Sequence, residues 1–145
     1  MYKLSIEDIE FKKIIPTNSQ IDELYALLVD RKYSISHKKV PSKSEHSDFV
    51  SQHPYVAWYL VYKNTSLIGS VYVQFDNSIG INLTEVFESD VVSVINYIKN
   101  NHKPLLPIKS VRSSEFFVNV ASENTNYIQI LKNLGKEEVA RSFVI

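Results

Sequence analysis

Apolar residues recur along this chain with two different spacings, which predict helices and strands. Helical spacing, in which every third or fourth residue is apolar, predicts helices near residues 19–31, 42–53, 89–101 and 127–134. Runs rich in Val, Ile, Tyr and Phe predict strands at residues 11–15, 55–62, 67–75, 79–83, 115–121 and 138–145. The predicted order is one strand, two helices, three strands, and then helix, strand, helix and strand.

Polar residues and glycine mark where the predicted helices begin and end. Ser19 with Asp22, and Ser42 with Glu45, have the three-residue spacing of a capping box, so each serine is predicted to start a helix. Gly135 follows the last apolar residue of the final helix and predicts its end. Residues 32–41 lie between the first two helices and are predicted to form a loop.

The lengths of the connections predict the topology. Turns of a few residues join the three strands between residues 55 and 83, so these strands must form an antiparallel meander. The helix at 89–101 then joins the strands at 79–83 and 115–121, which are expected to be parallel neighbours. The predicted class is α/β (α+β), with a mixed sheet and helices on both faces.

Composition narrows the class of protein. With 145 residues, 44% apolar and 22% charged, residues 1–145 are expected to form one globular domain. No apolar run approaches the ~20 residues of a membrane span, and the N-terminus lacks the apolar core of a signal peptide, which predicts a cytoplasmic protein without a membrane partner. A net charge of zero argues against nucleic acid as a partner.

Metal and thiol chemistry have little support in the sequence. The absence of cysteine excludes disulfides, zinc–thiolate sites and thiol catalysis. His37, His46 and His53 are not spaced as ligands on one helix face, so no metal site is expected.

Two segments carry a resemblance to a known family. In SENTNYIQILKNLGKEEVA, Asn124 stands eleven residues before Gly135, between a predicted strand and a closing helix, and the meander ends in IGINL. With the order of elements, these motifs resemble the GNAT superfamily of acyl-CoA-dependent N-acyltransferases over nearly the whole chain. The resemblance implies a GNAT-like, V-split central sheet in which the strands at 79–83 and 115–121 part from each other.

The resemblance also implies a cofactor site. Acetyl-CoA, or another acyl-CoA, would place its pantetheine arm between the parted strands. The backbone near Asn82 and Leu83 would contact that arm, and Asn124 would approach it from the other side. The loop that begins at Thr84 and includes Ser89 would surround the pyrophosphate. The acceptor implied is a primary amine of a small molecule, an amino sugar or a peptide.

The loop at residues 84–90 departs from the family pattern. It has no Gly, Lys or Arg, and it carries Glu85, Glu88 and Asp90 where two phosphates would lie. Like charges repel by roughly a kcal/mol or more near a surface, so weak pyrophosphate binding is predicted. The acids are also explained as helix N-terminal residues that cap free N–H groups. If phosphate does bind, Lys109 and Arg112 are the nearest basic candidates in sequence.

Two residues are candidates for acid–base chemistry. Glu85 follows the fourth strand and could take a proton from an ammonium group, or it could be a solvated residue at the helix start. Many family members carry a general-acid Tyr seven residues after the Asn, but that position is Leu131 here. Tyr127 lies one turn earlier, and its ring could also occupy part of the cofactor groove.

Four residues are candidates for binding the acceptor. Glu45 and His46 could line its pocket, or they could be a capping Glu and an exposed His. Trp58 and Tyr72 could form an aromatic wall, or they could serve core packing. Two functions remain in competition: an N-acetyltransferase, and a GNAT-like accessory module that has lost CoA binding.

Overall fold

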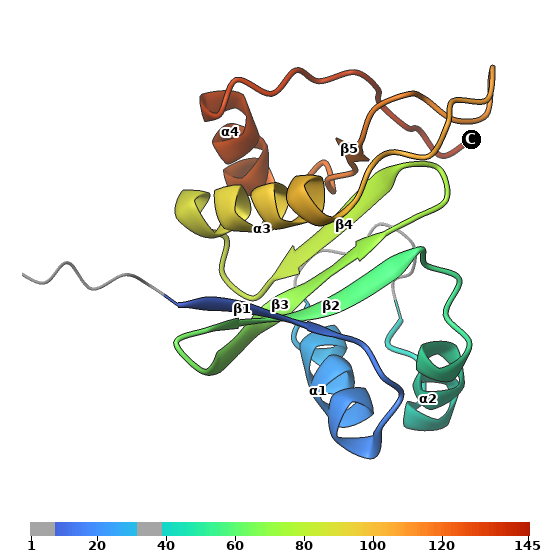
Figure 1. The fold of residues 1–145 in the computed structure, drawn as a ribbon, viewed down its shortest axis with the longest axis vertical. Helices are drawn as coiled ribbons and strands as arrows, with labels where there is room; N and C mark the ends of the chain where they lie inside the picture. The colour runs from blue at the N-terminus through green and yellow to red at the C-terminus, as the bar shows by residue number, and fades with distance from the viewer. Residues whose placement is uncertain (1–7, 32–38) are drawn as a thin grey trace, which may run out of the picture.

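The structure is a computed structural model that describes residues 8–31 and 39–145. Its strands are β1 Ile9–Lys13, β2 Ala57–Lys63, β3 Ser66–Val73, β4 Ser78–Leu83 and β5 Phe117–Val118. Its helices are α1 Asn18–Val29, α2 Lys43–Ser51, α3 Glu88–Asn101 and α4 Thr125–Asn133. The strands form one sheet in the order β1-β2-β3-β4-β5 (Figure 1).

The sheet is mixed, as the connection lengths predict. β1 to β4 pair antiparallel with their neighbours, and β5 pairs parallel with β4. The predicted meander and the predicted parallel pair are therefore both confirmed. Because one crossover helix, α3, joins β4 to β5, the two strands run in the same direction.

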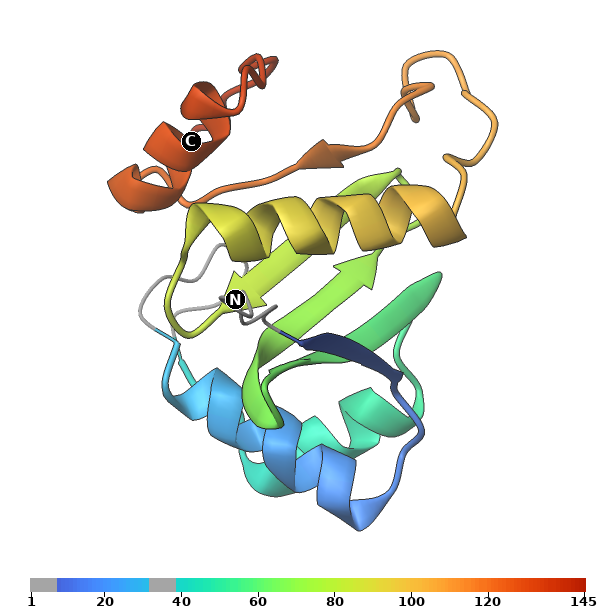
Figure 2. The same ribbon diagram turned by 60° about the vertical axis from the view of Figure 1, so that its left-hand side comes forward.

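The helices cover both faces of the sheet. Helices α1 and α2 lie on one face, and α3 and α4 lie on the other (Figures 1 and 2). Alternate residues of each strand face opposite sides, so each face has its own apolar cluster. Leu60 lies among buried residues of the α1–α2 side, while Val61 and Val71 pack with Val94 of α3. The confirmed class is α+β with helices on both faces.

β4 and β5 are joined only at one end, which leaves the other end of the pair open. Their register consists of Ser78 opposite Phe117 and Ile79 opposite Val118, after which the strands part. Asn77 holds the closed end: its side-chain amide donates to the carbonyls of Leu105 (3.0 Å) and Ser113 (2.8 Å). Its Oδ1 also accepts from the Leu105 N–H at 2.8 Å.

Two strand predictions differ from the structure. The strand predicted at 115–121 is reduced to two residues, because β4 offers a partner only at its start. The last strand, predicted at 138–145, is wrong: this segment belongs to no strand and is exposed throughout. Its β-branched and aromatic residues suit a strand, but the segment pairs with none of the described strands, although β5 lies at the edge of the sheet.

Two smaller predictions also need correction. The first helix begins one residue before Ser19, and Thr17 is its N-cap, accepting from the Gln20 N–H. The second capping box is confirmed, since Ser42 accepts from the Glu45 N–H at 3.1 Å and donates to the Glu45 carboxylate. Most of the predicted 32–41 loop, including His37, lies outside the described residues.

None of the helices in the described part of the chain is long and apolar enough to cross a membrane.

Candidate functional site

A pocket of about 370 Å³ opens beside the carboxyl end of β4. It lies between the C-terminal end of α1, the end of β4 with the connection to α3, and the start of α4. Its walls are formed by Leu27, Asp30, Arg31, Ile81, Asn82, Leu83, Thr84, Glu85, Val86, Phe87, Asn124, Asn126 and Tyr127. Six residues predicted from the sequence as cofactor-binding or catalytic are therefore brought together: Asn82, Leu83, Thr84, Glu85, Asn124 and Tyr127.

The backbone of β4 is free on the side of the split. Peptide groups alternate in direction along a strand. The Thr84 N–H donates toward β3, and the Asn77 carbonyl accepts from Phe117 on the β5 side. Alternation therefore turns the peptide groups of Ile81 and Leu83 toward the split. The last pair of the ladder is at Ile79, so among the described residues these groups have no strand partner.

Two polar side-chain atoms of the pocket walls are buried without a partner. Asn82 Nδ2 and the Tyr127 hydroxyl make no hydrogen bond with any described residue. Tyr127 is 3% exposed, and burial raises the pKa of its hydroxyl far above its ordinary value, so the group stays protonated. An unsatisfied buried polar atom is costly, so a partner that reached either of these two atoms would remove that cost.

Asn124 contributes to the pocket and also starts α4. It is the N-cap of the helix, and its Oδ1 accepts from the Tyr127 N–H at 3.4 Å. The cap uses only the oxygen, so the Nδ2 donors remain outside this interaction. Nearby, Asn126 Nδ2 donates to the Val86 carbonyl at 3.2 Å and ties α4 to the connection after β4.

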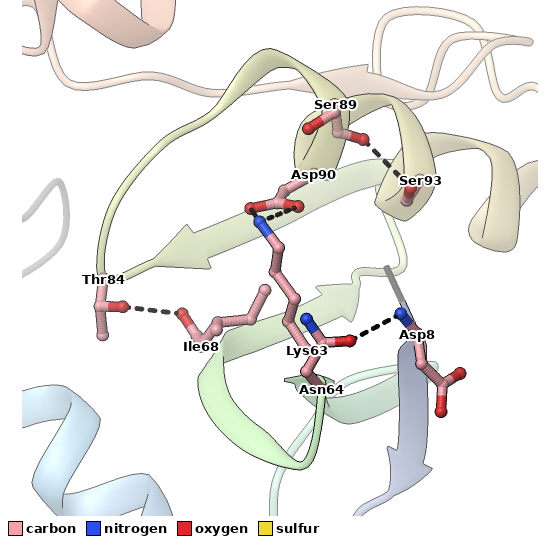
Figure 3. A network of polar contacts seen from close by, with 8 residues as sticks. All are labelled: Asp8, Lys63, Asn64, Ile68, Thr84, Ser89, Asp90 and Ser93. Atoms are coloured by element: carbon pink, nitrogen blue, oxygen red, sulfur yellow. Dashed lines mark hydrogen bonds and ion pairs between the residues drawn. The ribbon is translucent and has the colours of Figure 1, made fainter. Parts of the chain in front are cut away.

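The two residues that follow β4 are exposed at the edge of the pocket. Thr84 donates to the Ile68 carbonyl through both its N–H (2.8 Å) and its hydroxyl (3.2 Å), as Figure 3 shows for the hydroxyl. This pair of bonds holds the chain as it leaves the sheet. Glu85 comes next, and its exposed carboxylate is the first acid beside the open strand end.

The acids at the start of α3 do not act as caps. The N-cap is Phe87, which makes no side-chain capping bond. Asp90 is 3% exposed, and its carboxylate pairs with Lys63 of β2 at 3.2 Å (Figure 3). The expectation that these acids cap the helix is therefore wrong for Asp90. Ser89 lies outside the pocket, exposed in the first turn, and its carbonyl accepts from the Ser93 hydroxyl.

Arg31 is the positively charged residue among the described residues that line the pocket, and sequence reasoning missed it. It follows α1, some fifty residues before β4 in the chain, so only the packing of α1 on the sheet brings it there. Arg112, suggested from the sequence, is at the opposite end of β4, where its guanidinium donates to the carbonyls of Leu106 and Phe75. Lys109 belongs to that same loop and does not line the pocket.

Glu45 and His46 lie on α2, outside the pocket. Glu45 is exposed and forms the capping box with Ser42, which is the alternative that the sequence left open. His46 is 5% exposed rather than on the surface, and its ring lies 5.2 Å from that of Tyr25 on α1. Burial lowers the pKa of the His46 imidazole.

Trp58 and Tyr72 belong to an aromatic cluster on the α1–α2 face. Trp58 is 7% exposed, and its ring packs edge-on against Tyr55 with centroids 5.0 Å apart. Tyr72 is half-buried and stacks on Tyr55 at 4.1 Å. Gly80 makes room for this arrangement, because a Cβ at that position would overlap the Tyr72 ring. Neither residue lines the pocket, so their role in binding an acceptor remains a prediction.

Within residues 8–31 and 39–145, no group of three or more His, Asp or Glu side chains is placed to hold a metal ion.

The fold is shared with solved structures at low sequence identity. No protein-family model and no curated protein sequence matches the chain. A domain from Methanocaldococcus jannaschii matches with a TM-score of 0.65 and 17% identity, covering 94% of this chain and 93% of that domain. The aminoglycoside N-acetyltransferase AAC(6')-Iy, solved in complex with CoA, matches with a TM-score of 0.59 and 12% identity over 99% and 97% of the two chains.

A third match is the N-acetyltransferase PseH of Campylobacter jejuni, with a TM-score of 0.57 and 14% identity over 92% and 91% of the two chains. At such identities the likeness shows the fold. The chain thus has the fold of the GNAT acetyltransferases, as the sequence resemblance predicts.

Proposed function

We propose that this chain binds an acyl-thioester of coenzyme A at the open end of the β4–β5 pair and transfers the acyl group to a primary amine. The free peptide groups of β4 beside the pocket are the observation that carries the proposal. They offer an extended, amide-containing chain the hydrogen bonds that a neighbouring strand would otherwise make. The pantetheine arm of an acyl-CoA is such a chain.

The pocket suits the pantetheine arm better than the pyrophosphate. Peptide groups of Ile81 and Leu83 and the unpaired Asn82 amide provide both donors and acceptors for the arm. The phosphates would meet the N-terminus of α3, which has no side-chain cap but also no glycine. Glu85 and Glu88 are exposed there, and among the described residues of the pocket walls Arg31 is the cation that can compensate them.

Three groups of this chain have roles in acyl transfer. The Leu83 N–H would donate to the thioester carbonyl oxygen as negative charge develops on it. Glu85 would accept the proton that the attacking ammonium must lose. The Tyr127 hydroxyl would donate a hydrogen bond to the departing sulfur. Because its pKa is raised well above the ~8.5 of a thiol, its role is to stabilise the thiolate by a hydrogen bond and not to protonate it fully.

Ligand-induced stabilisation and transfer test the proposal together. Acetyl-CoA at ~100 times its dissociation constant adds about 2.7 kcal/mol to the free energy of unfolding, so the melting temperature should rise. A panel of aminoglycosides, amino sugars and N-terminal peptides, assayed by release of free thiol, should then reveal the acceptor. Absence of both a thermal shift and thiol release at millimolar acetyl-CoA would reject the proposal.

A GNAT-fold binding module without catalysis is the second candidate. The acids after β4 and the large Tyr127 side chain in the pocket wall favour it, because both oppose a complete cofactor. A rise in melting temperature without thiol release from any amine would support this alternative.

A further inference from the structure

The pocket has walls on both faces of the sheet. Side chains alternate along β4, and Ile79 and Ile81 pack in the cluster under α3 and α4. Gly80 and Asn82 therefore face α1 and α2. The ring of Tyr72, which packs with the α1–α2 cluster, lies over Gly80 and agrees with this assignment. The end of α1 closes the pocket on this face, and the start of α4 closes it on the other (Figures 1 and 2).

Two of the groups proposed to act on the thioester belong to the α3–α4 face. Leu83 and Tyr127 both pack with the core cluster of that face. Asp30 and Arg31 reach the pocket from the end of α1, on the opposite face. An acyl-CoA that lies along β4 and contacts the first pair leaves the second pair for the other reactant. The amine is therefore expected to approach the thioester from the α1 side.

The Arg31 guanidinium lacks an anionic partner in the described part of the chain. It is half-buried and makes no hydrogen bond or ion pair with a described residue. Its charge acts on Tyr55, where burial and the neighbouring Tyr72 raise the pKa of the hydroxyl and Arg31 opposes them. Tyr55 stays protonated at neutral pH, so it supplies no negative charge to Arg31. A half-buried cation of this kind is stabilised by an anionic group of a ligand.

The charges and the size of the pocket restrict the acceptor. The charged residues among its described walls are Asp30, Arg31 and Glu85, so both signs are present. An acceptor with several ammonium groups and no anion would be repelled by Arg31, whereas one with an ammonium and a carboxylate complements both signs. The volume of about 370 Å³ is near the lower end for small-molecule sites, and the end of the acyl arm takes part of it. The acceptor must therefore be small.

We propose that the acceptor is a small amino acid and that Arg31 binds its carboxylate, an inference that rests on the acyl transfer proposed above. A guanidinium and a carboxylate can form two parallel hydrogen bonds, which fix the direction of the acceptor as well as its charge. The ammonium then faces Glu85. The amine nitrogen bonds to the acyl carbon and the carbon–sulfur bond breaks. Of the two protons that the ammonium loses, one ends on the CoA thiol and one passes through Glu85 to solvent.

Matched acceptors test the role of the carboxylate. Thiol release from acetyl-CoA is measured with the common L-amino acids and with the amide of each, in which the negative charge is absent and the amine is kept. At least one amino acid should be acylated, and its KM should be roughly 10- to 100-fold lower than that of its amide, as expected for hydrogen bonds between charged groups. An amide that is acylated as efficiently as its amino acid would overturn the proposal.

Arg31→Met tests the residue. The variant should raise the KM of the preferred amino acid roughly 10- to 100-fold and remove the preference over its amide, and Arg31→Lys should restore part of that preference. Lys99→Met is the matched control, because Lys99 is an exposed cation of α3 outside the pocket walls, and it should keep the preference. Melting temperatures of the three variants show whether each is folded.

Two further outcomes assign Arg31 or the acceptor differently. If Arg31→Met weakens acetyl-CoA binding but keeps the preference for the amino acid, Arg31 serves the phosphates and the proposal is wrong. If the enzyme acylates only amines without a carboxylate, the proposal is wrong while acyl transfer stands.

Direct binding separates this inference from the failure of acyl transfer itself. A chain that shows neither a thermal shift with acetyl-CoA nor thiol release with any amine rejects acyl transfer. The carboxylate site is then tested alone: amino acids at millimolar concentration should raise the melting temperature of wild type, but not that of Arg31→Met. No rise with any amino acid would overturn the site as well.

Discussion

Lys63 of β2 and Asp90 of α3 form an ion pair across the α3 face of the sheet. The Lys63 ammonium lies 3.2 Å from Asp90 Oδ1 and 3.3 Å from Oδ2 (Figure 3). It also lies 5.2 Å from the centre of the Phe87 ring. The pair therefore joins the sheet to the first turn of α3, next to the connection that forms one wall of the pocket. It also neutralises one of the three acids that the sequence places near the proposed phosphates.

Lys63→Met is predicted to destabilise the fold more than Asp90→Asn. The Asp90 side chain is 4% exposed and that of Lys63 is 18% exposed, so removing the lysine leaves the more deeply buried charge without this partner. We expect Lys63→Met to lower the free energy of unfolding by about 3 kcal/mol, which is at the low end of the range for breaking a buried ion pair. Urea unfolding of both variants and of the double variant gives the coupling energy. Equal losses in the two single variants would contradict the predicted order.

Tyr127→Phe is predicted to keep or raise stability while lowering acyl transfer. The Tyr127 hydroxyl is buried without a partner among the described residues, so its removal takes away a desolvation cost of about 1 kcal/mol. Tyr59→Phe is the matched control, because the Tyr59 hydroxyl is hydrogen-bonded to His102 Nε2 at 2.7 Å. The free energy of unfolding of Tyr59→Phe should fall by about 1 kcal/mol. A clear loss of stability in Tyr127→Phe would mean that the hydroxyl has a partner in the free protein.

Asn124→Asp separates the two roles of Asn124. Asp caps a helix as well as Asn does, so the melting temperature should hold, whereas Asn124→Ala should cost about 1 kcal/mol. An ionised Asp cannot donate, so any contact that needs the Asn124 amide N–H groups is lost. Weaker acetyl-CoA binding in Asn124→Asp at unchanged stability supports a ligand contact. Unchanged binding would limit Asn124 to its capping role.

Local rules predict most of this fold. The spacing of apolar residues and short turns suffice for β2, β3 and β4, because neighbouring strands in sequence pair across tight turns. They also predict α3 to within one residue. The rules fail for residues 138–145, where the residue types suit a strand but the segment pairs with none of the described strands. A sequence pattern records what a segment can bury, not which surface it meets.

The pocket residues that lie in β4 or later in the chain can be predicted from the sequence, whereas those earlier in the chain cannot. Asn82, Asn124 and Tyr127 meet because they follow or flank the split strands, and the order of elements is enough to place them. Arg31 is missed because its position depends on how α1 packs across the sheet. The pairing of Asp90 with Lys63 is missed because it depends on how α3 packs on the sheet, so sequence alone overstates the negative charge of the loop after β4.

His46 is predicted to make stability depend on pH below about pH 7. Burial lowers the pKa of His46, so the unfolded chain binds a proton near its ordinary pKa of about 6.5 while the folded chain does not. Its contribution is therefore complete above pH 6.5 and is lost as the pH falls toward the folded pKa. His46→Phe should flatten this slope, by at most about 1.4 kcal/mol per pH unit.

Urea unfolding at several pH values between 5 and 8 measures the difference in slope. The pKa values of His53 and His102 are also lowered by burial, so the variant keeps part of the dependence. An identical slope in wild type and His46→Phe would show that His46 is protonated equally in both states.

The acids beside β4 are predicted to make the nucleotide part of CoA contribute little to binding. The dissociation constant of acetyl-CoA should be larger than ~10 μM, and the dissociation constant of acetyl-pantetheine should lie within about threefold of it.

The double change Glu85→Gln with Glu88→Gln removes like charge near the phosphates. It should lower the dissociation constant of acetyl-CoA about 3- to 10-fold at low salt, with a smaller effect at high salt. Acetyl-pantetheine, which has no phosphate, should be unaffected. Glu115→Gln is the matched control, because Glu115 is an exposed acid just before β5 at the closed end of the split. It should change neither the dissociation constant of acetyl-CoA nor that of acetyl-pantetheine.

Wild type that binds acetyl-CoA far more tightly than acetyl-pantetheine would contradict this prediction. The phosphates would then be held by cations such as Arg31, and removing the charge of Arg31 would weaken acetyl-CoA binding.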